Sequence, residues 1–267
     1  MAEEISVLET DIASMDEHSG LVQTTQTTIE VIEALTQLEP AGVSTVANHV
    51  GIPTSTAFDH LKTLEYHEFV TRENREYQLG TRFLSIGGRH RSRDVLYRVA
   101  RPEIEKMAYK TGEHANLMIE EFGQGVFLAK AKGEDAFQID TYIGKRVNLQ
   151  TTSAGKAILS CLPDDRIDEI IDRHGLPAIT PTTITDRGRL FEDIERIREQ
   201  GFATDDEERL QGVRCVAAPL RNPEDVAIGA VSISGPKSGM RSDRFKEDIP
   251  NLVLRTANVI EVNMEYR

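Results

Sequence analysis

Between residues 44 and 69 a short helical pattern, a turn and a longer helical pattern follow one another. Gly51 supplies the residue at which the first, two-turn pattern can end. The longer pattern places Ala57, Leu61 and Leu64 on one face. A short helix, a turn of three or four residues that contains glycine, and a longer helix make up the helix-turn-helix arrangement, whose second helix enters the major groove of DNA.

The segments on either side of this pattern extend it to a complete small domain. A helical pattern over residues 28–38 precedes it and stops before a proline and a glycine. Residues 69–72 and 76–79 follow it as two short strand patterns around a turn. Three helices and a two-stranded wing predict a winged helix-turn-helix domain over residues 21–83, with a small helical packing domain without a ligand as the alternative.

The exposed side of the second helix and the wing carry the side chains that we expect to contact DNA. The candidates are Thr54, Ser55, Thr56, His60, Lys62, Arg72, Arg75 and Tyr77. The hydroxyl groups, Lys62 and Arg72 are the expected phosphate contacts. Asp59 lies on the same helix, where it either accepts a hydrogen bond from a cytosine amino group or faces solvent.

Charge is unevenly distributed along the chain, which has a formal net charge of −13. Residues 1–88 carry 4 basic and 14 acidic side chains, and residues 1–20 are predicted to form an acidic disordered tail. Residues 89–110 carry 7 basic and 3 acidic side chains. Because apolar and basic residues alternate with helical spacing there, residues 84–112 are predicted to form a basic helical connector that packs on a partner subunit and places guanidinium groups beside DNA.

Composition excludes several classes of protein and suggests a habitat. No apolar stretch is long enough to cross a bilayer, the acidic beginning is unlike a secretory signal, and two cysteines give no disulfide framework, so we expect a cytoplasmic protein. The seven histidines lack metal-ligand spacing, and neither a metal nor a cofactor is predicted. Arginine accounts for 22 of the 31 basic residues, which together with the net charge suggests a protein that stays dissolved in concentrated salt.

The second domain, residues 113–267, is predicted to be a mostly antiparallel sheet flanked by helices, so that the whole chain belongs to the α+β class. Strand patterns cover residues 116–122, 126–131, 137–143, 147–149, 213–220 and 226–234. Helical patterns cover residues 155–161, 164–174, 187–200 and 243–266.

Several motifs of this second domain resemble the IclR family of transcriptional regulators. They are the run Ala154-Gly155-Lys156-Ala157, residues 182–186, residues 205–208, residues 212–219 and residues 232–236. The spacing from Gly201 to Asp205, Glu208 and Cys215 matches the family signature, and the resemblance extends from about Leu21 to the last helix.

The resemblance implies a regulator that binds double-stranded operator DNA as a homodimer, in a family in which tetramers built from two dimers are common. It also implies that the second domain is related to the GAF fold and binds a small effector. We expect this effector to be a carboxylate, as is often the case in the family, or a sugar-derived compound. The expected effector site consists of Ser153, Ala154, Asp205, Cys215, Ser232 and Ser234. Amides that precede a helix attract an anion, and hydroxyl groups at alternate strand positions face the same side, in agreement with this assignment.

Two alternatives accompany the effector site. Cys215 is either a small wall of the site, a packing residue, or the nucleophile of an enzyme, and the last role requires a base such as histidine within hydrogen-bond reach. Asp205 either lies in the site or belongs to a solvated run of acidic residues. The Gly-Lys pair at residue 155 is not a phosphate-binding loop, because Gln150 and Ala157 stand where such a loop needs glycine and a hydroxyl. A regulator without catalytic residues is therefore predicted.

Overall fold

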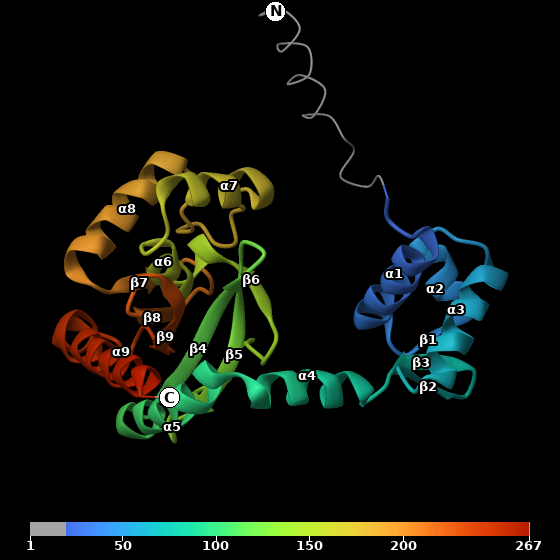
Figure 1. Cartoon of the computed structure of the whole chain (residues 1–267), viewed down its shortest axis with the longest axis horizontal. Helices are drawn as coiled ribbons and strands as arrows, with labels where there is room; N and C mark the ends of the chain where they lie inside the picture. Colours follow the sequence, from blue (N-terminus) through green and yellow to red (C-terminus); the bar gives the residue numbers. More distant parts are fainter. Residues whose placement is uncertain (1–19, 267) are drawn as a thin grey trace, which may run out of the picture. The chain divides into compact units, whose positions relative to one another are not determined.

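The computed structural model describes residues 20–266, in two compact units that divide after His90 (Figure 1). The predicted acidic tail lies outside the described residues except for Gly20. Each unit has a hydrophobic core of its own. The predicted two-domain organisation of the α+β class is confirmed.

The first unit is built on three helices, α1 (Gln23–Leu38), α2 (Val43–Val50) and α3 (Thr54–Tyr66). Their apolar faces enclose a core that includes Val31, Leu35 and Leu61, all fully buried. Helix α2 ends at Gly51, whose φ of 77° lies in the left-handed region that favours glycine. The short helix, turn and longer helix predicted from the sequence are therefore present.

A three-stranded sheet completes the first unit. Strands β2 (Val70–Glu73) and β3 (Glu76–Leu79) pair antiparallel, and β1 (Ala41–Gly42) pairs with the other edge of β3. Asn74 and Arg75 have φ values of 49° and 70°, which is the pattern of a tight hairpin turn of type I′. The predicted wing is thus confirmed, with one additional strand.

One residue of the wing does not lie where we expected it. Side chains alternate along β3, and Tyr77 lies on the face that packs against the helices, where it is 0% exposed. The assignment of Tyr77 as a DNA contact is wrong for this reason. Its ring instead supports Arg72, whose guanidinium group lies 5.3 Å from the ring centroid.

The predicted connector consists of two helices, α4 (Arg82–Arg93) and α5 (Val95–Thr111). Asp94 separates them and caps α5 through a hydrogen bond of 2.7 Å that Oδ1 accepts from the backbone N–H of Tyr97. No residue of α4, which is described over its whole length, is buried. By contrast, α5 buries Leu96, Val99 and four further residues in the core of the second unit, so only the first of the two helices contains the division between the units.

The second unit contains a six-stranded sheet in the order β6-β5-β4-β9-β8-β7, with every pair antiparallel. The strands are β4 (His114–Glu121), β5 (Gln124–Lys132), β6 (Arg146–Asn148), β7 (Ala203–Asp206), β8 (Val213–Arg221) and β9 (Ala227–Pro236). The sequence did not reveal β7. The strand predicted over residues 137–143 is wrong: in the described chain this segment forms no strand.

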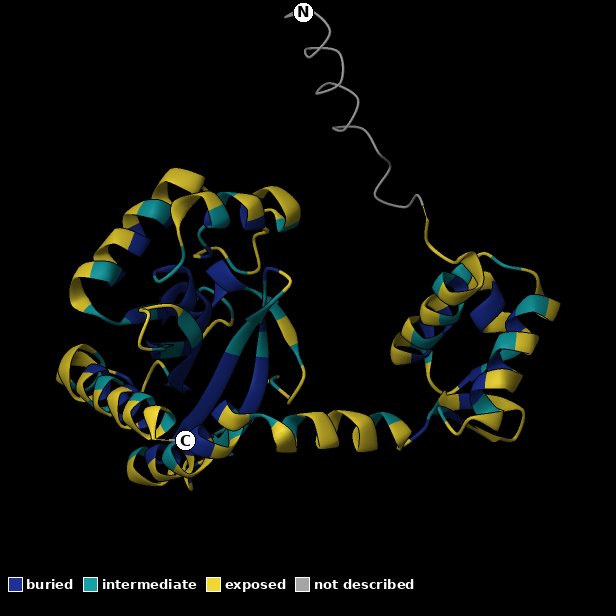
Figure 2. Ribbon diagram, in the orientation of Figure 1, coloured by how far each residue is buried: buried dark blue, intermediate teal, exposed yellow. Residues whose placement is uncertain are grey.

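Helices cover both faces of the sheet (Figures 1 and 2). One face packs against α6 (Ser153–Leu159), α7 (Asp164–His174) and α8 (Arg187–Gln200), and the other against α5 and α9 (Ile249–Glu265). A one-turn 3-10 helix, Leu149–Thr151, precedes α6, and a turn of π-helix, Arg244–Asp248, precedes α9. Figure 2 shows the strands buried between these layers, with the exposed residues on the outer sides of the helices.

Candidate functional site

The first candidate site is the surface formed by α3 and the wing. Thr54, Ser55 and Lys62 are exposed on α3, and Arg72 and Arg75 are exposed on the wing. Each of these five side chains is therefore accessible to a ligand of this unit. Asp59 is exposed on the same helix, which is compatible with both of its proposed roles.

Two of the other predicted DNA contacts on α3 are only partly exposed. Thr56 is half-buried, and so is His60, whose Nδ1 lies 2.9 Å from the Thr28 hydroxyl of α1. This hydrogen bond ties the His60 ring to the neighbouring helix. The positively charged groups of the surface are thus limited to Lys62 on α3 and the two arginines of the wing.

The second candidate site is a small cavity in the second unit that is partly open to solvent. All six residues predicted for the effector site line it: Ser153, Ala154, Asp205, Cys215, Ser232 and Ser234. The strand register explains why they meet, because Ser234 pairs with both Cys215 on β8 and His114 on β4, and Ser232 pairs with Asn116. Alternate residues of three adjacent strands therefore face one space.

Residues that the sequence did not reveal complete the cavity wall. They include His114 and Asn116 on β4, Phe127 and Lys130 on β5, and Ile139, Thr141, Arg209 and Leu210 in loops. The segment predicted as a strand over residues 137–143 thus contributes wall residues instead. Only the pairing of β4 with β9, which joins residues more than a hundred positions apart, brings these groups to the predicted serines.

The polar groups of β4 are only partly satisfied within the protein. The Asn116 amide lies 3.4 Å from the Ser232 hydroxyl and 3.3 Å from that of Ser234, while Asn116 Oδ1 has no hydrogen-bond partner among residues 20–266. His114 Nε2 donates to the carbonyl of Phe137 at 2.5 Å, and Nδ1 is buried without a partner in the described chain. Burial lowers the pKa of His114, so its neutral ring leaves Nδ1 as an acceptor.

Two cations lie in the wall of the same cavity. Lys130 donates to the Thr141 carbonyl at 2.9 Å, and burial, with the charges of Arg209 and Lys132, lowers its pKa. Arg209 donates to the Thr141 hydroxyl at 3.0 Å and to the Asp140 carbonyl at 2.9 Å. These hydrogen-bond partners are neutral oxygens, and the nearby carboxylate of Asp140 is itself paired with Lys145, so both cations can attract an anion in the cavity.

Asp205 is the acidic residue of the wall. It is 3% exposed, so the alternative that it belongs to a solvated charge run is wrong. Its Oδ1 accepts a hydrogen bond of 2.7 Å from the backbone N–H of Glu208. Burial, followed by the negative charge of Glu208, raises the pKa of Asp205 to about 7, so a large fraction of this carboxyl group carries a proton at neutral pH.

The geometry and chemistry of both units lead to the same family. The model of the bacterial transcriptional regulator IclR C-terminal domain matches residues 90–262, and that of the IclR helix-turn-helix domain matches residues 25–74. The chain belongs to the IclR family. It is an IclR-type transcriptional regulator with a DNA-binding helix-turn-helix domain and a C-terminal effector-binding domain.

Similar proteins support this assignment to the IclR family. The probable HTH-type transcriptional regulator ArcR of Halobacterium salinarum is 30% identical over 89% of this chain and 92% of its own length. The crystal structure of a putative transcriptional regulator, RHA06195 from Rhodococcus sp. RHA1, is 28% identical, with a TM-score of 0.80 over 92% of this chain and 99% of that one.

A second solved structure shares the fold of this chain at 21% identity. It is an IclR homologue from Microbacterium hydrocarbonoxydans, which has been crystallised in complex with 4-hydroxybenzoate. Its TM-score is 0.77 over 92% of this chain and 100% of its own.

The enzyme hypothesis for Cys215 finds no support in an IclR-type cavity of this form. Burial, together with the charge of Asp205, raises the pKa of the Cys215 thiol well above its ordinary value, which suppresses the nucleophilic thiolate. His114 lines the same cavity, but among the described residues neither ring nitrogen makes a hydrogen bond to Cys215: Nε2 donates to the Phe137 carbonyl, and Nδ1 has no partner. Cys215 is therefore a wall residue of the cavity.

Within residues 20–266, no helix has both the length and the apolar character needed to cross a membrane. The same residues contain no group of histidine, cysteine and carboxylate side chains arranged to hold a metal ion.

Proposed function

We propose that the first unit binds operator DNA through α3 and the wing, as a homodimer. Helix α3 lies in the major groove, with the hydroxyl groups of Thr54 and Ser55 at its N-terminal end near the base edges and phosphates. Lys62 and Arg72 contact phosphate groups, and Arg75 extends from the tip of the wing. Two copies place their α3 helices in successive major grooves, about 34 Å apart, on a palindromic site.

We propose that the effector bound by the second unit is a small carboxylate that also carries a hydroxyl group. The observation that supports this class is the combination of two cations with unpartnered polar atoms in one cavity. Lys130 and Arg209 attract the carboxylate, while the acceptor atom of His114 needs a donor. The Asn116 amide offers either its oxygen or its NH₂ group, because serine hydroxyls can donate or accept.

Matched ligand pairs test this class of effector. Calorimetry with the full chain compares 4-hydroxybenzoate with benzoate, and glycolate with acetate, so that each pair differs in one hydroxyl group. The hydroxylated member is expected to bind at least tenfold more tightly, because without it a buried polar atom stays unpaired. Equal affinities within both pairs, or effector binding that survives Asp205→Ala combined with Ser234→Ala, would contradict the assignment.

DNA fragments selected by the protein from its source genome provide the probe for the first unit. Footprints on these fragments are expected to weaken in Lys62→Ala and Arg72→Ala. Lys246→Ala removes an exposed lysine from the second unit and serves as the control, with an unchanged footprint. Unchanged protection by all three variants would show that the assigned DNA surface is wrong.

A further inference from the structure

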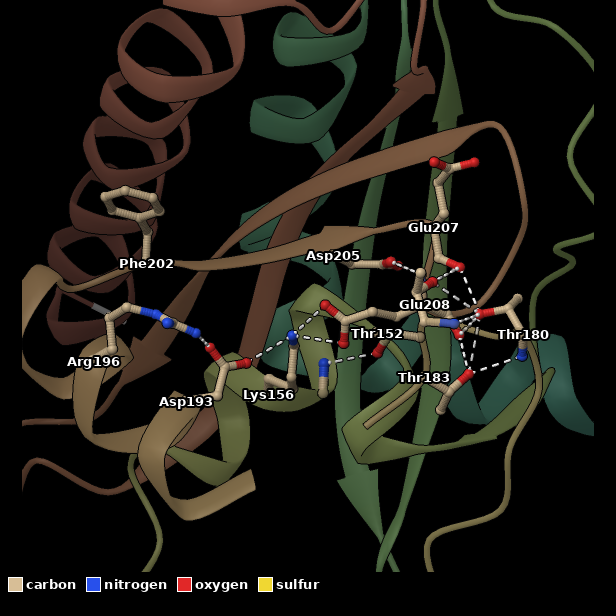
Figure 3. A network of polar contacts seen from close by, with 12 residues as sticks. Thr152, Lys156, Thr180, Thr183, Asp193, Arg196, Phe202, Asp205, Glu207 and Glu208 are labelled. Atoms are coloured by element: carbon tan, nitrogen blue, oxygen red, sulfur yellow. Dashed lines mark hydrogen bonds and ion pairs between the residues drawn. The ribbon is translucent and has the colours of Figure 1, made fainter. Parts of the chain in front are cut away.

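A fully buried lysine lies behind the wall of the cavity (Figure 3). Lys156 on α6 is 1% exposed, and its Nζ lies 2.7 Å from both carboxylate oxygens of Glu208. The same nitrogen lies 2.8 Å from Asp193 Oδ2 on α8, and Asp193 is also paired with Arg196. Because an unpaired charge in this position would be very costly, this lysine needs a carboxylate partner, and it has two.

The position of Lys156 in α6 relates it to the cavity. Helix α6 begins with Ser153 and Ala154 in the cavity wall, and Lys156 follows two residues later on the side that faces Glu208. Gly155 allows this close packing, because a Cβ at that position would lie 2.1 Å from the Leu149 carbonyl oxygen. The lysine is thus anchored to the same helix that forms part of the wall.

Glu208 connects this buried charge to Asp205. Its side chain is held by Lys156, while its backbone N–H donates to Asp205 Oδ1 at 2.7 Å. The Glu208 carbonyl accepts hydrogen bonds from the Thr180 and Thr183 hydroxyls at 3.1 and 2.5 Å, as Figure 3 shows. The side chain, amide and carbonyl of Glu208 are therefore all held, which fixes this residue against Asp205 at the end of β7.

We propose that Lys156 and Glu208 are positioning residues that fix the buried carboxyl group of Asp205 in the cavity wall, and that binding of an anionic effector beside this carboxyl group is coupled to proton uptake. This inference rests on the proposed function of the cavity. A protonated carboxyl group donates a hydrogen bond to a carboxylate, whereas an ionised one repels it. For an anion that binds only the protonated form, affinity falls about tenfold for each pH unit above the Asp205 midpoint.

The charged and titratable groups around Asp205 are those that the proposal must take into account. Burial raises the pKa of Asp205, and the negative charge of Glu208, which follows β7, raises it further. The positive charge of Lys156 on α6 lowers it. Cys215 on β8 lies beside it with a thiol that stays protonated. Lys130, His114 and Arg209 line the same cavity from β5, β4 and the loop before β8. Of these groups, Glu208 contributes the negative charge that favours the protonated form.

Two carboxylates on one lysine provide a matched pair of variants. Glu208→Gln and Asp193→Asn each remove one negative charge from Lys156 while preserving the shape of the side chain. Only Glu208 acts on Asp205. We therefore expect carbon-13 NMR titration of the full chain to give an Asp205 midpoint near pH 7, lowered in Glu208→Gln and unchanged in Asp193→Asn. The Asp205→Asn variant assigns the signal.

The positioning role has a separate measurement. Lys156→Met combined with Glu208→Gln removes one charge of each sign and leaves Asp193 paired with Arg196, so no charge is stranded. We expect hydrogen exchange at the backbone N–H of residue 208 to accelerate at least tenfold in this variant, while exchange of the α8 backbone amides stays unchanged. Equal acceleration throughout the unit would indicate a merely structural role and would overturn the proposal.

The titration also separates this inference from the proposed function, because it needs no ligand. A wild-type Asp205 midpoint below about pH 5, or equal shifts in the two single variants, would overturn the inference even if 4-hydroxybenzoate binds. If the titration behaves as expected, calorimetry of 4-hydroxybenzoate in buffers of different ionisation enthalpy should show proton uptake near pH 7. Failure of the hydroxylated carboxylates to bind would instead count against the proposed function.

Discussion

The carboxylate of Asp94 accepts a hydrogen bond from the backbone N–H of Tyr97, and this contact marks the point where α4 ends and α5 begins. An aspartate at this position satisfies one of the free N–H groups of the first turn of α5. Since α5 is packed in the core of the second unit, its start is fixed, whereas no residue of α4 is buried.

Removing this cap should destabilise the second unit. We expect Asp94→Ala to lower the free energy of unfolding by about 1 kcal/mol, the usual effect of losing an N-cap side chain. Denaturant titration followed by circular dichroism measures it. Asp243→Ala is the control, because Asp243 precedes a helical turn without making a side-chain cap and should change stability by less than about 0.5 kcal/mol.

Two adjacent glycines in the middle of α4 should make this helix weak. No described atom lies within 4 Å of the position where a Cβ of Gly87 or Gly88 would be, and neither has a positive φ. Each change to alanine is therefore expected to stabilise helical α4 by about 0.5 to 1 kcal/mol. Slower hydrogen exchange of the α4 backbone amides in Gly87→Ala and Gly88→Ala would show this stabilisation.

The opposite result is expected for a glycine in a crowded position. Gly155→Ala should destabilise the second unit, because its Cβ would overlap the Leu149 backbone. For the earlier prediction on α4, an unchanged hydrogen-exchange rate of the α4 amides in Gly88→Ala would show that the glycines do not weaken this helix.

Asp205 should make the stability of the second unit depend on pH. Its pKa is about 7 in the folded chain and near 3.8 when unfolded, so between these values the folded state holds a proton that the unfolded state lacks. The free energy of unfolding therefore falls as the pH rises from about 4 to about 7, by at most about 4 kcal/mol. Asp205→Asn should lose this contribution and gain stability relative to wild type at pH 8.

Denaturant titrations of both proteins at several pH values test this prediction. Other carboxyl groups contribute in the opposite direction, since ion pairing lowers the pKa of Asp206 and Glu207. The difference between variant and wild type isolates Asp205. A difference that stays constant from pH 4 to pH 8 would contradict the raised pKa.

DNA binding should depend weakly on salt. Lys62, Arg72 and Arg75 are the cations of the assigned DNA surface, and three phosphate contacts from each copy of a homodimer correspond to a slope of about −5.4 in log affinity against log salt. Because the chain has a net charge of −13, we expect a shallower slope than this. Titration of a selected fragment with potassium chloride measures it, and a steeper slope would refute the expectation.

The sequence predicted the elements that have strong local signals. Helices α7 and α8 begin and end at the predicted residues, the latter because Asp186 caps its start and Gly201, with φ of 81°, ends it. Predictions failed where burial depends on partners distant in sequence. Tyr77 was misplaced because the face of β3 that packs against the helices depends on residues distant in sequence. His114 was missed because it reaches the cavity through the pairing of β4 with β9.

Side chains of the central strands point alternately into the cavity on one face of the sheet and into the hydrophobic core on the other face. Ser232 and Ser234 face the cavity, while Val231 and Ile233 between and beside them pack with α5 and α9. Likewise, Asn116 faces the cavity and its neighbours Ala115 and Leu117 face the other side. A ligand that displaced these strands would therefore also shift the apolar surface on which α5 packs, and α5 is the helix that follows α4 along the chain.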